Sequence, residues 1–312
     1  MTTQSNSSHT KSTIILVLII LILPFTPLKS QELTKEERQK IDAALPEEAQ
    51  VTPEKKRRIL VTNLSKRDGK LWKGPSNAII PVHNYAIEKM GKITGAYEAV
   101  FNDDIEMFSP ENIKEFDAIF FLNTVGVLFD DPELRSSLLN YILDGGGFIG
   151  VHDAIATFVQ YPVYDQWPAF GDMLGGTENG GHPWNGELMT LSIEDQNSPL
   201  TEMFEGTTFQ IADQAFQLQE EVIRDDLHVL LSIDVEKTGI SPKHSILPVR
   251  QKDLDFPMSW IRSYGAGRVF YLGLGHSAHV FWNPVLLEHL LAGIQFAVGD
   301  LEADTTPTPQ PK

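Results

Sequence analysis

Residues 145–153 read GGGFIGVHD, a glycine-rich turn followed by a short apolar run that ends at His152 and Asp153. An apolar run of this length after turn-forming glycines is typical of a strand buried on both faces, as in a parallel sheet. Before the turn, Pro132 begins a segment whose leucines recur at helical spacing. A helix that passes through a tight turn into a buried strand is the repeating unit of an α/β fold.

The same alternation continues on both sides of this stretch, over residues 58–300. Further helices are expected at 78–90, closed by Gly91, and at 285–296, after Pro284. Strands are expected at 59–61, 117–123, 148–151, 189–193, 229–233, 258–261 and 269–272. Strands that alternate with helices predict a three-layer α/β/α domain with a mostly parallel central sheet.

Composition excludes several classes of function. The 312 residues hold 25 Lys+Arg against 42 Asp+Glu, a formal charge of -17, so nucleic acid is not expected as a partner. The chain has no cysteine, which excludes disulfides, zinc–thiolate sites and thiol nucleophiles. Any catalysis must therefore come from histidines, carboxylates, hydroxyls or a metal.

The two ends of the chain differ in composition from its middle. Residues 1–30 include the uncharged stretch TIILVLIILILPFTPL at 13–28, which predicts a signal peptide cleaved near Ser30 and export to the periplasm or the extracellular space. The alternative is an uncleaved N-terminal anchor, which would make the membrane a partner, because Leu28 and Lys29 fit a cleavage site poorly. Residues 31–57 are expected to be a charged spacer, and residues 301–312 a disordered Pro/Thr-rich tail.

The residues that follow the strands are the candidates for a site, because ligands of open α/β sheets bind outside the carboxyl ends of the strands. Two strands are followed at once by a histidine, His152 and His276. We expect the side chains of His152, His276 and Asp213 to converge on one cleft. Asp153 is expected to turn away from the imidazole of His152 and to serve as a helix N-terminal charge.

Several segments resemble the ThuA-like (trehalose utilisation) family, whose domain is similar to class I glutamine amidotransferases and thus flavodoxin-like. The matching pieces follow one another over residues 58–300, at 116–124, 145–152, 181–184 and 267–276. In the amidotransferases, a cysteine occupies the strand-to-helix elbow and a histidine a later strand end. Here these places correspond to His152 and His276, so the resemblance implies the architecture without a thioester mechanism.

The resemblance and the loop residues together point to a saccharide ligand. His152, paired with His276 or Asp213, is the candidate acid/base pair, although His152 could instead only fix the elbow by bonding a neighbouring loop. Aromatic rings can pack on the C–H faces of a sugar while polar groups bond its hydroxyls. The candidate substrate-binding residues are Asn77, Asp153, Tyr164, Trp167, His182, Trp184 and Trp282. The remaining histidines, His83 among them, are expected to be structural or on the surface.

No cofactor is firmly implied. His152, His182 and His276 could offer imidazole nitrogens to a divalent metal, with Asp153 or Asp213 beside them, but their wide separation in sequence does not require one. The chain also departs from the family: Asn77 stands where a histidine is common, and the positions of an Asp-Glu-x-Tyr motif read DQAF at 213–216.

These departures leave two classes of function open. One is an exported ThuA-like protein that acts on a disaccharide or oxidised sugar, as a hydrolase, lyase or isomerase. The other is a non-catalytic sugar-binding or accessory protein of the same fold.

Overall fold

A computed structural model describes residues 1, 32–160, 165–219, 224–240 and 254–308. The chain divides into two compact units, Met1–Ser30 and Gln31–Lys312, and the described helices and strands all belong to the second. Tyr164 and nearly all of the expected signal segment lie outside the described residues. Within the described part, no helix is both long enough and apolar enough to cross a membrane.

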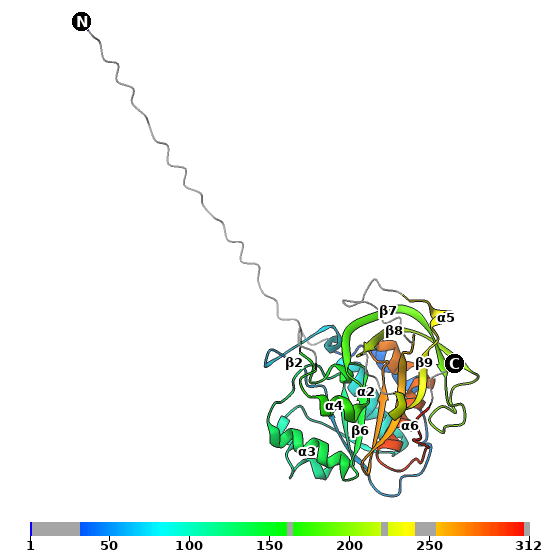
Figure 1. The fold of residues 1–312 in the computed structure, drawn as a ribbon. Helices are drawn as coiled ribbons and strands as arrows, with labels where there is room; N and C mark the ends of the chain where they lie inside the picture. Colours follow the sequence, from blue (N-terminus) through cyan, green and yellow to red (C-terminus); the bar gives the residue numbers. More distant parts are fainter. Residues whose placement is uncertain (2–31, 161–164, 220–223, 241–253, 309–312) are drawn as a thin grey trace. The chain divides into compact units, whose positions relative to one another are not determined.

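One sheet runs through the domain (Figure 1). Within the described residues it has nine strands, in the order β4-β1-β5-β6-β11-β10-β9-β7-β8. The first five strands in this order are mutually parallel, and the other four continue antiparallel. Their bounds are β1 (Arg58–Thr62), β4 (Glu98–Phe101), β5 (Ala118–Leu122), β6 (Gly147–Val151), β7 (Glu178–Ile193), β8 (Thr208–Leu218), β9 (His228–Ile233), β10 (Pro257–Tyr264) and β11 (Gly267–Leu272). A separate hairpin pairs β2 (Lys66–Arg67) with β3 (Lys70–Leu71).

Helices cover both faces of the sheet, as the three-layer prediction requires. Strand β5 shows why: Phe120 and Leu122 pack into one apolar cluster, while Ile119 and Phe121 pack into another on the opposite face. The first cluster holds side chains of α1 (Lys35–Ala44), α2 (Ile80–Thr94) and α6 (Pro284–Ala297), and the second those of α3 (Pro132–Leu143) and α4 (Pro168–Leu174). The shorter helices are η1 (Pro75–Ile79), η2 (Ile105–Phe108), η3 (Ile113–Glu115), η4 (His152–Ala156), η5 (Arg224–Asp226), α5 (Val235–Thr238) and η7 (Ala278–Trp282).

Several element boundaries differ from the sequence prediction, and two of these differences change the setting of residues singled out there. Helix α2 does not stop at Gly91 but runs to Thr94 and is capped by Gly95 in the left-handed conformation, φ 67°. Gly91 lies inside the helix, and glycine is needed there because a Cβ would lie 2.6 Å from the ring and the carbonyl oxygen of Tyr97. Strand β7 begins at Glu178, so that His182 and Trp184, expected in a loop, lie on a strand with irregular pairing to β8.

The segment 31–57 is part of the domain, which corrects its prediction as a spacer. Thr34 and Glu37 form a capping box at the start of α1, and Ile41 of that helix is fully buried in the core. Further on, the side chain of Gln295 accepts from Gln50 N–H at 2.9 Å and donates to the Val51 carbonyl at 2.7 Å.

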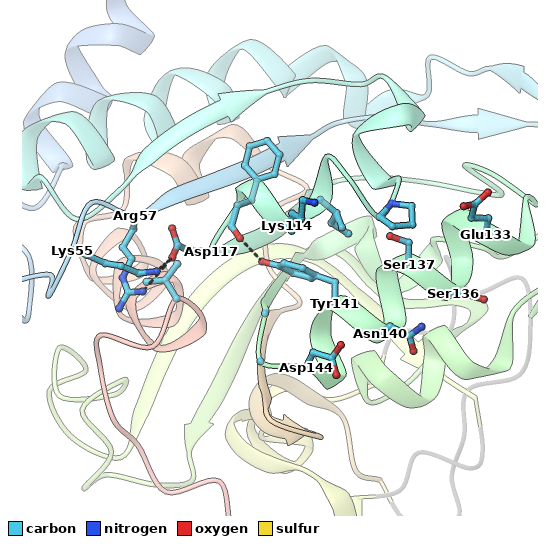
Figure 2. A pocket seen from close by; sticks show the side chains of 16 residues that line it. Lys55, Arg57, Lys114, Asp117, Glu133, Ser136, Ser137, Asn140, Tyr141 and Asp144 are labelled. Atoms are coloured by element: carbon cyan, nitrogen blue, oxygen red, sulfur yellow. Dashed lines mark hydrogen bonds and ion pairs between the residues drawn. The ribbon is translucent and has the colours of Figure 1, made fainter.

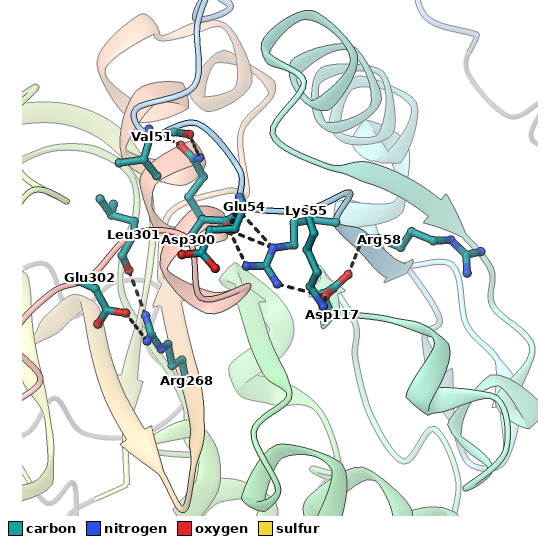
Figure 3. A network of polar contacts seen from close by, with 11 residues as sticks. Val51, Glu54, Lys55, Arg58, Asp117, Arg268, Asp300, Leu301 and Glu302 are labelled. Atoms are coloured by element: carbon teal, nitrogen blue, oxygen red, sulfur yellow. Dashed lines mark hydrogen bonds and ion pairs between the residues drawn. The ribbon is translucent and has the colours of Figure 1, made fainter.

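Arg57 completes this attachment (Figure 3). Its guanidinium pairs with Asp300, just after α6, at 2.5 Å and with Asp117, just before β5, at 3.3 Å. These two aspartates and their hydrogen bonds raise the pKa of Arg57. The ion pairs join three distant parts of the chain at the amino ends of β1 and β5.

The predicted disordered tail is also ordered as far as it is described. Leu301 is buried, and Thr308 N–H donates to the Leu227 carbonyl at 2.9 Å. The imidazole Nδ1 of His228 lies 2.6 Å from the carbonyl oxygen of Thr306. Residues 301–308 therefore pack beside the start of β9, where Pro and Thr make backbone and hydroxyl contacts; residues 309–312 lie outside the described part.

Candidate functional site

His152 stands immediately after β6 and takes an uncommon backbone conformation. Its φ is 48°, in the left-handed region that costs a non-glycine residue on the order of 1 kcal/mol. Two contacts hold it there: its Nδ1 lies 2.9 Å from the Gly273 carbonyl oxygen, and its own carbonyl accepts from the Tyr271 hydroxyl at 2.8 Å. Because a carbonyl only accepts, Nδ1 carries a proton, and in the neutral ring Nε2 is the unprotonated nitrogen.

Asp153 faces this nitrogen, contrary to the expectation that it would point away. Its Oδ1 lies 3.4 Å from His152 Nε2, and both side chains are buried. The physical reason is the left-handed turn at His152, which reverses the direction of the chain and lets two consecutive side chains share one side. A carboxylate and an imidazole nitrogen are thereby set against each other at the end of β6.

His276 reaches the same place from the loop after β11. Its ring centroid lies 5.3 Å from that of His152. The loop approaches β6 closely at Gly275, where φ is 142° and a Cβ would lie 2.9 Å from a methyl of Val151. Burial, followed by the nearby His152, lowers the pKa of His276.

Asp213, on β8, positions this loop. Its carboxylate accepts three main-chain N–H groups, those of Gly275 at 2.7 Å, His276 at 3.3 Å and Ser277 at 2.9 Å. His152, His276 and Asp213 therefore lie close together, although none of the three is in the lining of a pocket described below. The sequence suggested Asp213 as one member of an acid/base pair. Its oxygens instead accept hydrogen bonds from the backbone beside His276, which are the contacts of a positioning residue.

Two further imidazoles belong to the group. His182 of β7 stacks near Phe216, whose ring lies 4.7 Å from those of both His182 and His152. Burial, with His152 nearby, lowers the pKa of His182 to about 4. His83 of α2, which the sequence suggested was merely structural, is fully buried against Phe281, and burial together with His152 and His276 lowers its pKa to about 3.

Buried polar atoms without hydrogen bonds gather around these rings. In the described part of the chain they include His152 Nε2, Asp153 Oδ2, His276 Nδ1 and the Oδ1 of Asn123, whose amide donates to the Gly275 carbonyl at 3.0 Å. Buried polar groups are nearly always hydrogen-bonded, and leaving one without a partner costs about 1–3 kcal/mol. A cluster of them at the carboxyl ends of β5, β6 and β11 has the chemistry of a ligand site.

Comparison with known proteins agrees with this architecture. The sequence profile described as ThuA, trehalose utilisation, matches residues 71–297. The chain belongs to the ThuA family.

Solved structures of ThuA-like proteins share the fold. One from Bacteroides uniformis is 19% identical, covers 79% of this chain and 93% of its own, and superposes with a TM-score of 0.62. Another from Parabacteroides merdae is 15% identical, covers 78% and 91%, and has a TM-score of 0.54. No functionally curated protein gives a sequence match to the chain.

A pocket of about 400 Å³ opens beside the histidines of this ThuA domain. Its walls come from the β2–β3 hairpin, the loop after β5 and the segment after η4, and His182 lies in its lining. His182 thus connects the pocket to Phe216 and His152. We regard this pocket as the candidate cleft because it lies at the carboxyl ends of the strands.

A larger pocket, of about 590 Å³, lies at the opposite edge of the sheet (Figure 2). Lys55, Asp117, Tyr141 and Asp144 are in its lining, next to the amino ends of β1, β5 and β6. Lys55 is paired with Asp117 at 2.7 Å, and the Tyr141 hydroxyl donates to the Phe116 carbonyl. Size alone therefore does not identify the ThuA site, since none of the clustered histidines lines this larger pocket.

The aromatic side chains proposed as a sugar platform are largely in the core. Trp184 is 1% exposed and donates its indole N–H to the Gly239 carbonyl, and Trp167 is packed among phenylalanines. Trp282 is partly buried under α1, where Lys40 lies over its ring. Asn77 caps the turn before α2 by accepting from Gly74 N–H. Phe216 is the aromatic ring in contact with the histidines, at the position where the family motif has a tyrosine.

The side chains considered as metal ligands are used for other contacts in the part of the chain that the structure describes. No group of three or more His, Asp or Glu side chains there is placed to hold an ion. His152 Nδ1 is already used by the Gly273 carbonyl, and the Asp213 carboxylate by backbone amides.

Proposed function

We propose that this chain is an exported ThuA protein of carbohydrate utilisation, which takes a disaccharide or an oxidised sugar into the cleft beside His182 and acts on it through His152. One observation carries the proposal: buried polar atoms without hydrogen bonds, on His152, Asp153, His276 and Asn123, lie together at the strand ends. A polyhydroxylated ligand supplies donors and acceptors that could complete such a set.

In this proposal, His152 Nε2 is the atom that accepts a proton from the substrate. Nδ1–H is held by the Gly273 carbonyl, which fixes the tautomer, and Asp153 is placed to stabilise the imidazolium that forms. His276 is kept neutral by its lowered pKa, so it can accept or donate a hydrogen bond without adding a second positive charge.

Export rests on a separate feature, the uncharged stretch at residues 13–28. A hydrophobic segment of this length, followed by prolines, is typical of a secretory signal. Fractionation of cells that express the full chain, with mass determination of the exported product, tests this part by itself. A product that begins near Gln31 supports cleavage; retention in the cytoplasm would remove export from the proposal.

The function is tested by calorimetry with a panel of mono- and disaccharides, followed by a product assay on each ligand that binds. His152→Gln should lower turnover by about 100-fold or more and change sugar affinity by less than about tenfold, because it removes the base while retaining a polar side chain. His228→Gln is the matched control, since His228 lies on β9 and contacts Asp195 and Thr306.

The outcomes separate the two function classes. Turnover that depends on His152 supports an enzyme. Binding without turnover by the unaltered chain would favour the non-catalytic sugar-binding protein, and the absence of binding by every saccharide would overturn both.

A further inference from the structure

The hairpin that walls the candidate cleft is basic in an acidic chain. Residues 66–73 hold four cations, Lys66, Arg67, Lys70 and Lys73, and one acid, Asp68, whereas the chain as a whole carries a formal charge of -17. Lys66, Arg67 and Asp68 belong to the lining of the 400 Å³ pocket. This wall of the pocket therefore contributes two cations and one acid to the lining.

The backbone keeps these cations in place. Asp68 and Gly69 have φ values of 52° and 70°, the pattern of a tight two-residue hairpin turn, which sets Arg67 directly across from Lys70. The Arg67 guanidinium also lies over the ring of Trp72, 4.5 Å from its centroid, which holds it at the hairpin.

The hairpin is also fastened to the floor of the pocket. Lys66 N–H donates to the Val125 carbonyl at 2.9 Å, and Lys66 Nζ donates to the Leu128 carbonyl at 2.6 Å. Gly126, with φ 76°, leaves the room that the Lys66 carbonyl occupies, because a Cβ there would collide with it. The basic wall is thus a built part of the cleft.

We propose that the ligand of this cleft is an acidic saccharide, a sugar that carries a carboxylate or a phosphate. This inference rests on the proposed function and names its substrate class. The anionic group lies toward Arg67, and the neutral part of the sugar lies toward His182. Arg67 and His182 both belong to the lining of the pocket, on walls formed by different parts of the chain.

The inference is tested by calorimetry with three probes that share one ring: glucose, glucuronate and glucose 6-phosphate, each also as a disaccharide derivative. Arg67→Gln should weaken binding of the acidic probes by about three- to tenfold and leave neutral sugars within about twofold. Arg67→Lys should restore most of the affinity. Raised salt should weaken only the acidic probes, because it screens exposed charges.

Lys92→Gln is the matched control. It removes the same charge from an exposed position in the last turn of α2, at the amino edge of the sheet. Preference for glucuronate over glucose 6-phosphate, or the reverse, identifies the anionic group.

Equal affinities for neutral and acidic sugars, unchanged by Arg67→Gln, would overturn the acidic class while leaving the proposed function intact. In that case the hairpin cations only keep a short, exposed strand pair from associating with other chains. Failure of every saccharide to bind would overturn the proposed function and this inference together.

Discussion

At the scale of single residues, the site depends on side chains that already form hydrogen bonds with the main chain. The Asp213 carboxylate holds three amides of the His276 loop, and His152 Nδ1 is held by Gly273. His152 Nε2 and His276 Nδ1 are buried and have no hydrogen bond in the described part of the chain. The contact of His152 Nδ1 therefore leaves Nε2 as the nitrogen of this ring that can meet a ligand.

Replacement of Asp213 by asparagine tests this positioning role. An amide offers one acceptor oxygen and turns its NH2 toward main-chain N–H groups, so at least one of the three bonds is lost. We expect Asp213→Asn to lower the free energy of unfolding by about 1–3 kcal/mol. Hydrogen exchange at Gly275 and Ser277 should become faster.

Asp172→Asn, at an exposed position on α4, is the control and should change stability by less than about 0.5 kcal/mol. Unchanged exchange at Gly275 and Ser277 in Asp213→Asn would show that the carboxylate does not hold the loop.

The sequence identified the site residues that directly follow strands. It missed the residues whose place in the site depends on how side chains pack. His152 and His276 were identifiable because each comes directly after a buried apolar run. The orientation of Asp153 was not, because it depends on the left-handed backbone of His152. His83 lies on the apolar face of α2. A histidine that packs in the core and a histidine that borders a site have the same helical spacing, so the sequence does not distinguish them.

At the scale of elements, the N-terminal segment shows how a charged sequence can still form part of a fold. Helix α1 presents charged side chains to solvent and places Ile41 in the core shared with α2 and α6. Only Ile41 and Ala44 of this helix are buried, and the rest of the segment is dominated by charged residues, which is why the sequence of residues 31–57 predicts a spacer.

Ile41→Ala measures the contribution of this helix. Truncation of a fully buried isoleucine removes apolar contacts and leaves a cavity, so the free energy of unfolding should fall by about 2–4 kcal/mol. The measurement is urea denaturation of the chain that begins at Gln31. Lys35→Ala, at an exposed position on the same helix, should change the value by less than about 0.5 kcal/mol. Equal, small effects of both substitutions would restore the spacer interpretation.

The predicted and observed sheets agree best where strands are buried on both faces. Strands β1, β5, β6 and β11 are continuous apolar runs and were expected. Strand β8 and the first half of β7 were not, because they mix exposed and buried residues, and their pairing shifts register repeatedly. Glycine, asparagine and proline in β7 are typical of a loop, and only the partner strand makes them extended.

At the scale of the whole molecule, two histidines are fully buried in the core with lowered pKa values. His289 of α6 is fully buried between Leu200 and Ser259, with Nδ1 2.6 Å from the Leu200 carbonyl oxygen, and burial lowers its pKa to about 4. His83 follows the same rule with a pKa of about 3. Burial thus keeps both imidazoles uncharged in the folded chain down to a pH well below the ordinary histidine pKa.

The sign of the resulting pH effect is fixed by the direction of the shifts. Above the ordinary histidine pKa of 6.5, folded and unfolded chains are both neutral at His83 and His289, and stability is complete. Below it, the unfolded chain takes up protons that the folded chain excludes. The free energy of unfolding should therefore fall as pH drops from 6.5 toward 4, by at most about 1.4 kcal/mol per pH unit for each histidine.

Urea denaturation between about pH 7 and about pH 5 checks this fall before most carboxylates titrate. His289→Gln should be less stable than the unaltered chain at neutral pH, because it disturbs the core, but should lose stability less steeply on acidification, because one of the excluded protons is gone. A free energy of unfolding that stays constant over this range, or an equal slope in His289→Gln, would show that these imidazoles do not resist protonation in the folded chain.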